Sequence, residues 1–199
     1  MKIVLASNNA GKLAELQAML APVGCALVTQ GELGIAPAPE PFCTFVENAL
    51  AKARHAAQHS ALPALADDAG LCVDAFGGLP GVDTAFYAKR FGLPQSDANN
   101  VQALLAQMRN LDQRQATLVS TLVALRTPHD PEPLIAVGRL RCEIAPAPLG
   151  ENGFGFDPVI YLTQWGQTLA QLPVAVKNAH SHRGQAVRAM LALMRERWL

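Results

Sequence analysis

The sequence predicts an α/β protein of the mixed α+β kind, in which helices flank a mixed sheet. The first observation is that short apolar strands alternate with helical segments early in the chain. The second is a pair of long β-rich segments separated by a proline-containing turn. Alternation favours parallel strands and a hairpin adds antiparallel ones, so the sheet should be mixed. A length of 199 residues fits one domain, and residues 1–199 are treated as such.

The chain is expected to begin with a strand, a small-residue loop and a helix. Residues 2–6 are a short strand candidate that is apolar after Lys2, and Leu13, Leu16 and Leu20 then recur on one helical stripe. A second strand is predicted at residues 26–29. A loop rich in proline and glycine follows over residues 31–41.

A capping box predicts the next helix. Thr44 and Glu47 have the S/T-x-x-E spacing, and the alanine-rich segment after them favours helix to about Ser60. The remaining expected elements are strands 64–67 and 71–75 joined by a turn at Ala69 and Gly70, a helix from Ser96 to Met108, hairpin strands 116–126 and 134–144, a strand 158–162 and a last helix capped by Ser181.

Composition excludes several classes of protein. Lys plus Arg and Asp plus Glu number 16 each, so the chain lacks the basic excess of a general nucleic-acid binder. No window approaches the length of a membrane span, and no membrane partner is expected. The four cysteines show no C-x-x-C spacing, which disfavours zinc and fits a reducing, cytoplasmic compartment.

The segment 66–74, Ala-Asp-Asp-Ala-Gly-Leu-Cys-Val-Asp, places three carboxylates in an otherwise apolar run. A buried carboxylate is costly unless it is paired or binds a metal, so chemistry is expected here. Successive strand residues face opposite ways, so of Asp67 and Asp68 one should face a site and the other a structural partner. Mg²⁺ commonly uses one or two carboxylates together with substrate phosphates, and Glu40 is a plausible second ligand. A turn with solvated carboxylates is the alternative, which the apolar neighbours disfavour.

Three further polar segments complement the acidic strand. The loop at residues 7–12 leaves a strand and enters a helix, where free amides attract anions, although an ordinary capped loop gives the same pattern. Lys177, His182 and Arg183 precede or open the last helix, where solvated residues are the alternative. The segment 153–158 holds two glycines and two phenylalanines, which suits base stacking or simply a turn with core side chains.

These stretches together resemble the inosine triphosphate pyrophosphatase family, whose bacterial members act as dITP/XTP pyrophosphatases. The resemblance spans nearly the whole chain, in the family's order. The matching stretches are SNNAGK (7–12), TFVENALAKA (44–53), ADDAGLCVDAFGGLPGV (66–82), GFGFDPV (153–159) and SHRGQA (181–186). It implies a twisted mixed sheet with two lobes around a central nucleotide cleft, a homodimer and dependence on Mg²⁺. The implied reaction cleaves non-standard purine nucleoside triphosphates such as ITP, dITP and XTP to the monophosphate and pyrophosphate.

The resemblance also implies roles for individual residues. Asp68 matches the general base and a metal ligand, and Glu40 matches the other metal ligand. The nucleotide-contacting positions correspond to Ser7, Asn8, Asn9, Ala10, Gly11, Lys12, Ala69, Phe154, Gly155, Phe156, Asp157, Lys177, His182 and Arg183. The chain departs from the family where Ala69 replaces a usual serine and Phe86 a usual arginine.

Roles within the nucleotide follow from charge and hydrogen-bond polarity. We expect Lys12 and Lys177 to hold phosphate oxygens. A 6-oxopurine carries an acceptor and an N1–H donor, which suit His182 or Arg183 as donor and Asp157 as acceptor. The alternatives are a pyrimidine or modified-nucleotide pyrophosphatase of the septum-inhibition type and a non-catalytic nucleotide-binding module.

Overall fold

The computed structural model describes residues 1–198, and of Val23 it describes only the backbone. The chain divides into two compact units. The first comprises Met1–Asp68, Ser120–Gly138 and the C-terminal segment from His182, and the second comprises Ala69–Val119 and Arg139–Ser181. That the whole chain forms one two-lobed domain stays a prediction.

Seven strands form a sheet in the order β2-β1-β3-β4-β5-β6-β7. The strands are β1 (Lys2–Leu5), β2 (Ala26–Thr29), β3 (Ala64–Val73), β4 (Gln115–Leu125), β5 (Leu134–Ile144), β6 (Ile160–Leu162) and β7 (Gln167–Thr168). β1 pairs in parallel with β2 and β3, whereas β6 pairs antiparallel with β5 and β7. The predicted mixed sheet is therefore confirmed.

Helices lie between several of these strands in the sequence and after the last of them. The α-helices are α1 (Ala10–Leu20), α2 (Phe45–Ser60), α3 (Asp97–Met108), α4 (Val174–His180) and α5 (His182–Arg197). Short 3₁₀ segments are η1 (Ala21–Val23), η2 (Asp74–Phe76), η3 (Gly81–Phe91), η4 (Asp157–Val159) and η5 (Leu169–Gln171). No helix within residues 1–198 is both long and apolar enough to cross a membrane.

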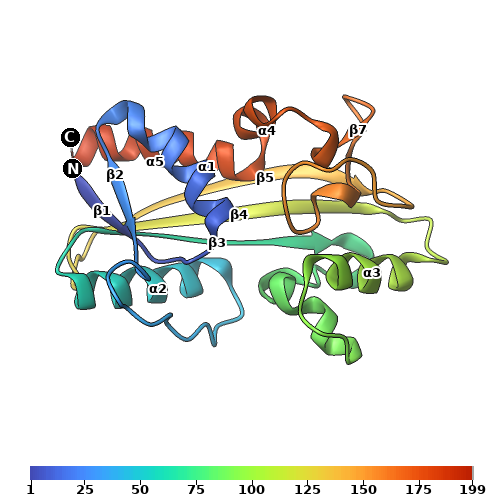
Figure 1. Cartoon of the computed structure of the whole chain (residues 1–199), viewed down its shortest axis with the longest axis horizontal. Helices are drawn as coiled ribbons and strands as arrows, with labels where there is room; N and C mark the ends of the chain where they lie inside the picture. The colour runs from blue at the N-terminus through green and yellow to red at the C-terminus, as the bar shows by residue number, and fades with distance from the viewer. Residues whose placement is uncertain (199) are drawn as a thin grey trace. The chain divides into compact units, whose positions relative to one another are not determined.

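The first unit is a three-layer sandwich, because its strands are apolar on both faces. Ile3 and Leu5 of β1 pack with α1 and α5, whereas the alternate residue Val4 packs with α2. Figure 1 shows α1 and α5 above these strands and α2 below them. Helices on both faces are the arrangement expected of parallel strands that read as continuous apolar runs.

Helix α2 owes its close packing to small side chains. Its buried stripe is built from alanine, at Ala49, Ala53, Ala56 and Ala57. Two polar residues, Asn48 and Lys52, are buried on the same helix. Lys52, a buried lysine within an alanine stripe, places its ammonium group against the sheet.

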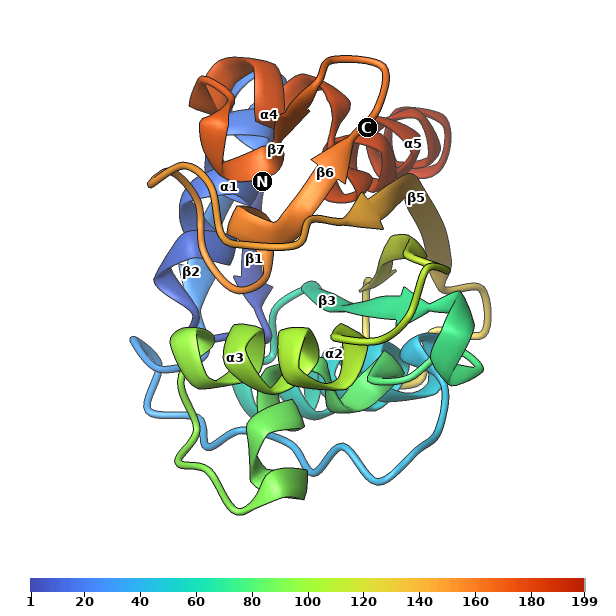
Figure 2. The ribbon, with the colours of Figure 1, turned by 90° about the vertical axis from the view of Figure 1, so that its right-hand side faces the viewer.

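The second unit has its own hydrophobic core. Val101, Leu104 and Met108 of α3 join apolar residues of β3, β4, β5 and β6 in one cluster. Figure 2 shows α3 on one side of the end of β3 and α4 on the other. The core is thus assembled from segments that lie far apart in the sequence.

Most predicted elements are found, several with the expected bounds. β2 and β5 match their predicted ranges, and Thr44 and Ser96 cap α2 and α3. The predicted hairpin is also found, because β4 and β5 are adjacent and Ile144 N–H donates to the Arg114 carbonyl at 2.8 Å. The pattern of caps and alternating apolar residues was sufficient for these elements.

The predicted turn at Ala69 and Gly70 is wrong, because β3 runs unbroken through both residues. Partners for its amides are available on the side away from β4. The Leu71 amide donates to Thr84 Oγ1 at 2.9 Å, and the Val73 amide donates to the Leu79 carbonyl at 3.0 Å. Because these amides are satisfied in an extended chain, the glycine does not need to turn.

Helix α4 was not predicted, and it changes the setting of Lys177. Lys177 lies within this seven-residue helix, and one residue, Ser181, separates the helix from α5 in the sequence. Val174 and Val176 of α4 are exposed, so the helix lacks the apolar stripe by which periodicity identifies helices. Ser181 lies directly before α5, where the sequence placed the cap.

Candidate active site

Asp67 is a carboxylate of the first unit and is almost completely buried. Its carboxylate accepts a hydrogen bond from Ser120 Oγ at 2.7 Å and lies 3.0 Å from Lys12 Nζ and 3.1 Å from Arg183 Nη2. Burial alone would raise the pKa of Asp67, but Lys12, Arg183 and the Ser120 hydroxyl outweigh it and hold the pKa far below its usual range. Asp67 therefore stays ionised and fixes two cations beside β3.

Arg183 enters this cluster from the first turn of α5. It is buried, and it also pairs with Glu15 of α1 through Nη1. The alternative that His182 and Arg183 are solvated is wrong, because both are buried. An arginine that pairs with two carboxylates at once is held in place by its planar, five-donor head group.

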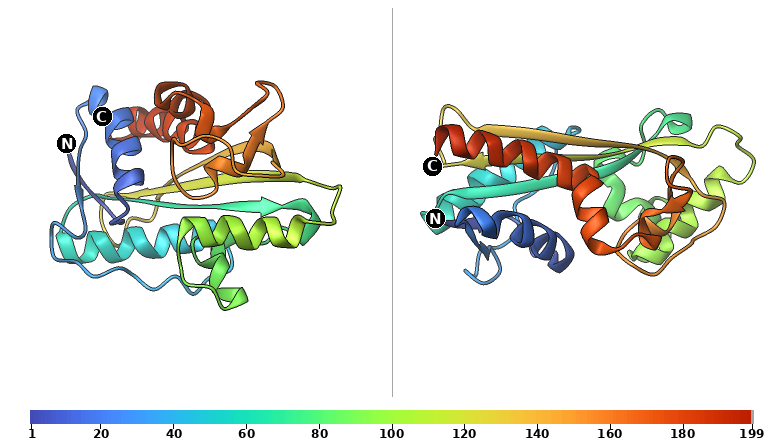
Figure 3. Two further views of the ribbon diagram at one scale, coloured as in Figure 1. Left: turned by 45° about the vertical axis from the view of Figure 1, so that its right-hand side comes forward. Right: turned by 90° about the horizontal axis from the view of Figure 1, so that it is seen from above.

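A glycine on β5 lets α5 approach the sheet closely enough for these ion pairs. A Cβ atom at Gly138 would lie 1.9 Å from the carbonyl oxygen of His182 and 2.6 Å from the backbone nitrogen of Ala186. Figure 3 shows the length of α5 running beside the strands of the first unit. No side chain fits at Gly138 without moving the first turns of α5, which carry His182 and Arg183.

Replacing Gly138 with alanine is therefore expected to destabilise the protein by about 1–3 kcal/mol, the usual cost of overpacking a dense interior. Chemical denaturation followed by circular dichroism measures this loss. The control is Ile135→Ala on the same strand, whose side chain is 44 % exposed, so that little packing is lost. An unchanged midpoint for Gly138→Ala would show that α5 is not pressed against β5.

The residue after Asp67 faces a different set of partners. Asp68 Oδ1 accepts from Lys52 Nζ at 2.7 Å, and the same Nζ lies 2.8 Å from Glu40 Oε2. Burial raises the pKa of Asp68 to about 6, although Lys52 acts in the opposite direction. Burial also acts to lower the pKa of Lys52, but Asp68 and Glu40 prevail and raise it. One ammonium group thus joins the two predicted metal ligands.

The donor set at Asp68 fits a hard divalent cation. Its Oδ2 atom is buried and has no hydrogen-bond partner among the described residues, which is costly for a carboxylate oxygen. Glu40 is 43 % exposed at its side chain, so it can move to share a ligand. No group of three His, Cys, Asp or Glu side chains within residues 1–198 is arranged around a common metal position. Two carboxylates are nonetheless sufficient where substrate phosphates and water complete the shell.

The loop at residues 7–12 runs into the N-terminus of α1, as the sequence predicted. Asn9 is the N-cap and accepts from the Lys12 amide, and Ser7 Oγ accepts from the Asn9 amide. Asn8 Oδ1 accepts from the Gly31 amide at 2.9 Å. Ala10 and Gly11 are the first residues of α1, so this segment faces outward from a helix N-terminus. The side chain of Lys12 is tied to Asp67 rather than free in solvent.

The second unit assembles another part of the predicted site. Lys177 Nζ lies 2.6 Å from Asp157 Oδ2 and 4.7 Å from the centre of the Phe154 ring. The Phe154 amide donates to Asp157 Oδ2 at 3.0 Å. Lys177 and Asp157 are both buried. A cation, an anion and an aromatic ring in contact suit a flat heterocycle with polar edges better than a phosphate chain.

Two departures from the family pattern also have a defined setting in the second unit. Ala69 lies in β3, so it offers only backbone groups. Phe86 is exposed, and Lys89 Nζ lies 5.0 Å from the centre of its ring. A cation is therefore present beside Phe86 even though the usual arginine is absent.

The predicted site residues thus fall into two groups. Residues 7–12, Glu40, Asp68, His182 and Arg183 belong to the first unit, whereas Ala69, Phe154–Asp157 and Lys177 belong to the second. Sequence reasoning missed Lys52, Glu15 and Ser120. Lys52 carried a detectable signal, because it interrupts an alanine stripe on a predicted buried helix face, whereas Glu15 and Ser120 carried none.

Comparisons with known proteins show the family to which the chain belongs. The model of the Ham1 family matches residues 3–193. The chain is 75 % identical to a dITP/XTP pyrophosphatase of Albidiferax ferrireducens over 199 residues, all of both chains. It is 70 % identical to a dITP/XTP pyrophosphatase of Verminephrobacter eiseniae, again over all of both chains. A HAM1 protein from Coxiella burnetii is 40 % identical, with a TM-score of 0.90 over 98 % of this chain and 99 % of that one.

Proposed function

Because the chain belongs to the Ham1 family, we propose that it hydrolyses non-standard purine nucleoside triphosphates, such as dITP, ITP and XTP, to the monophosphate and pyrophosphate. The observation that carries this proposal is the buried Asp68 carboxylate, which shares Lys52 with Glu40 and keeps one oxygen without a partner among the described residues. Relatives that match the full length of the chain are named dITP/XTP pyrophosphatases.

In the proposed reaction, water attacks the α-phosphorus and the bond to the oxygen bridging the α- and β-phosphates breaks. Asp68 accepts the proton of the attacking water, and pyrophosphate leaves. A pKa of about 6 suits this role, because the carboxylate is ionised at neutral pH yet remains a better base than an ordinary aspartate. Lys52 holds Asp68 in place through its 2.7 Å contact.

We further propose that Glu40 and Asp68 hold Mg²⁺ together with phosphate oxygens. Bound Mg²⁺ would neutralise charge that develops on those oxygens. The donor set supports this proposal, since Asp68 Oδ2 needs a partner that the described residues do not supply. Lys12 and the amides at the start of α1 are proposed to bind phosphate oxygens as well.

The base is proposed to bind in the second unit, against Phe154. There Lys177 can donate to a 6-oxo group, which replaces the phosphate role first expected for it. Its contacts with Phe154 and Asp157 support this change. Adenine has an amino group at that position and so offers no acceptor there to the Lys177 ammonium group, which stays paired with Asp157. Contacts of His182 and Arg183 with the nucleotide stay predictions.

The proposal is tested by incubating the protein with inosine, xanthosine, guanosine and adenosine triphosphates, with Mg²⁺ and without it. We expect pyrophosphate from the inosine and xanthosine nucleotides only when Mg²⁺ is present. Two mismatched hydrogen bonds at about 1–3 kcal/mol each predict at least a hundredfold preference over the adenosine nucleotide. Pyrophosphate and orthophosphate are measured separately in each reaction.

Two outcomes of this assay would overturn the proposal. Orthophosphate as the first product would place the cleavage elsewhere in the triphosphate. A bound but uncleaved nucleotide would favour a non-catalytic binding module. The septum-inhibition type is not favoured, because the full-length relatives carry the dITP/XTP pyrophosphatase name. Preferential turnover of a pyrimidine nucleotide would restore that alternative.

The homodimer and the cytoplasmic location also stay proposals. Leu79, Phe86 and Phe91 leave large apolar side chains exposed in the second unit, which supports an interface with a second copy. The four cysteines are free, which supports a reducing compartment.

A further inference from the structure

Asp97, the first residue of α3, makes a contact that the proposed mechanism does not use. Its Oδ2 atom accepts a hydrogen bond from the Gly155 amide at 2.7 Å, across 58 positions of the chain. A carboxylate in the first turn of a helix usually serves the free amides of that helix. In α3 the side chain of Ser96 already serves that purpose through the Asn99 amide. Asp97 is thus available to bind another segment.

The segment that Asp97 binds is the turn that carries Phe154. Gly153 and Gly155 have φ angles of +83° and +63°, a conformation that favours glycine. Asp157 fixes the Phe154 amide from within the turn, at 3.0 Å. Asp97 fixes the next amide, that of Gly155, from outside it. The amides of Phe154 and Gly155 are therefore each bound by a carboxylate, the first by Asp157 of the turn and the second by Asp97 of α3.

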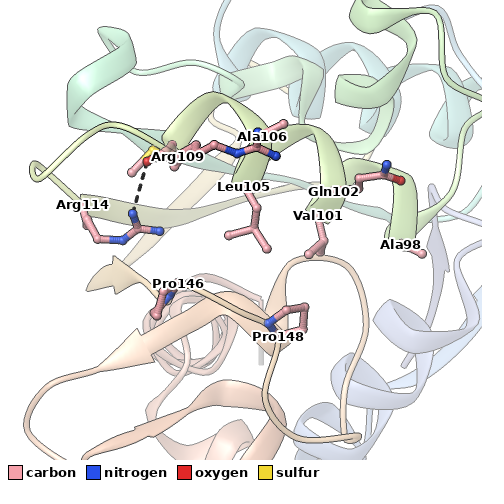
Figure 4. A pocket seen from close by; sticks show the side chains of 10 residues that line it. Ala98, Val101, Gln102, Leu105, Ala106, Arg109, Arg114, Pro146 and Pro148 are labelled. Carbon is pink, nitrogen blue, oxygen red and sulfur yellow. Dashed lines mark hydrogen bonds between the residues drawn. The ribbon is translucent and has the colours of Figure 1, made fainter.

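Two pockets lie beside α3 near this turn, although Phe156 of the turn is buried in the same cluster as Val101 and Leu104 of α3. One pocket of 560 Å³ is lined by α3 and by Pro146 and Pro148, and Figure 4 shows Val101 and Leu105 pointing into it. A second pocket of 400 Å³ is lined by Asp97, Phe154 and Gly155. Ala98, Val101 and Pro148 line both pockets. Because this second pocket leaves open space beside Phe154 and Gly155, the hydrogen bond to Asp97 is a direct restraint on this part of the turn.

We infer that Asp97 is a positioning residue for base recognition, which holds the Phe154 ring over Lys177 through the Gly155 amide. This inference rests on the proposed function, since it assigns the Phe154 ring to the base. Without the Asp97 contact, Phe154 and Lys177 bind the base in a less ordered arrangement. We expect the hydrolytic role of Asp68 to be unaffected, because Asp68 is held in place by Lys52.

The test compares Asp97→Ala with the wild-type chain in two assays. Isothermal titration with inosine monophosphate gives a Kd without turnover and without a metal. Steady-state release of pyrophosphate from inosine triphosphate gives KM and kcat separately. We expect Asp97→Ala to raise Kd and KM by about five- to tenfold, less than the full effect of losing one charge-assisted hydrogen bond, because Asp97 acts on the base only through the turn. We expect kcat to stay within about twofold of the wild type.

Two matched variants separate positioning from stability. Ser96→Ala removes the cap of the same helix and leaves the Gly155 contact intact, so it should lower the thermal midpoint without changing Kd. Asp97→Asn keeps an oxygen acceptor and should recover most of the affinity. An unchanged Kd and KM for Asp97→Ala, or an equal rise for Ser96→Ala, would overturn the inference.

The assay of the wild-type chain distinguishes a failure of this inference from a failure of the proposed function. A wild-type chain that releases no pyrophosphate rejects the proposed function and the inference with it. An active wild-type chain with an unaffected Asp97→Ala variant rejects the inference alone.

Discussion

Replacing Asp68 with asparagine should lower the rate of pyrophosphate release by about 10²- to 10⁴-fold, the usual contribution of a positioned general base. Asparagine has nearly the same shape and still accepts a hydrogen bond from Lys52, but it cannot take a proton from water. The fold should survive, because burial already opposes the charge of Asp68 and raises its pKa to about 6. Steady-state kinetics with inosine triphosphate, together with a thermal midpoint, measures both effects.

The control for this variant is Glu132→Gln in the same unit. The Glu132 side chain is exposed and forms a 3.4 Å ion pair with the exposed Arg197, so the loss of its charge should leave turnover unchanged. If Asp68→Asn kept near-wild-type turnover and nucleotide affinity, Asp68 would not be the base.

Asp67→Asn is expected to have the largest effect on stability, about 3–5 kcal/mol, because it leaves the buried Arg183 and the partly buried Lys12 without their shared anion. Asp67 is fully buried between Lys12 and Arg183. The control is Asp83→Asn, which removes an exposed pair with Arg90 at 3.0 Å and should cost less than about 1 kcal/mol. Urea denaturation at neutral pH compares the two variants, and equal losses would contradict the role of burial.

The pH dependence of the Asp67→Asn effect follows from the lowered pKa. The folded protein holds the pKa of Asp67 below its unfolded value of about 4, so the unfolded state takes up the proton first. The stability that Asp67 contributes is complete above about pH 4 and is lost as the pH falls towards the folded pKa. The difference in free energy of unfolding between wild type and Asp67→Asn should therefore shrink below about pH 4. If the difference in free energy of unfolding stayed constant down to about pH 2, the pairs with Lys12 and Arg183 would not be what lowers the pKa of Asp67.

Local signals in the sequence were sufficient for the elements that begin with a cap. Thr44 and Ser96 mark helix starts by hydrogen bonds that involve residues only three positions away. The two partners of such a hydrogen bond lie close together in the sequence, so the sequence alone is enough to recognise the cap. Asn9 caps α1 by an equally local hydrogen bond, although this cap was not predicted from the sequence.

Elements that depend on distant partners could not be predicted. β3 continues through Gly70 because Thr84 and Leu79 supply acceptors for its amides, which no local pattern reveals. Helix α4 is short and exposes its valines, so it has no periodic stripe. Glu15 and Ser120 likewise become part of the ion-pair cluster only through folding.

The candidate site shows the same division. The unusual charge of the segment 66–74 is enough, by itself, to mark Asp68 as a chemically active group. The alternation of side chains along a strand also predicts that one of the two adjacent aspartates serves a structural partner. Neither pattern identifies the cations that serve as partners, since Lys52 and Arg183 reach β3 from helices far away in the chain.

The alanine stripe of α2 limits how this protein can be engineered. Larger aliphatic residues at Ala49, Ala53 or Ala56 would be the obvious choice for a designer seeking heat tolerance, and each would lift the helix away from β3. Lys52 belongs to that helix, so the same changes would move its ammonium group away from Asp68. On the buried face of α2, substitutions that raise thermal stability would therefore lower turnover. Stabilising substitutions should be sought on helix faces that hold no buried charged side chain.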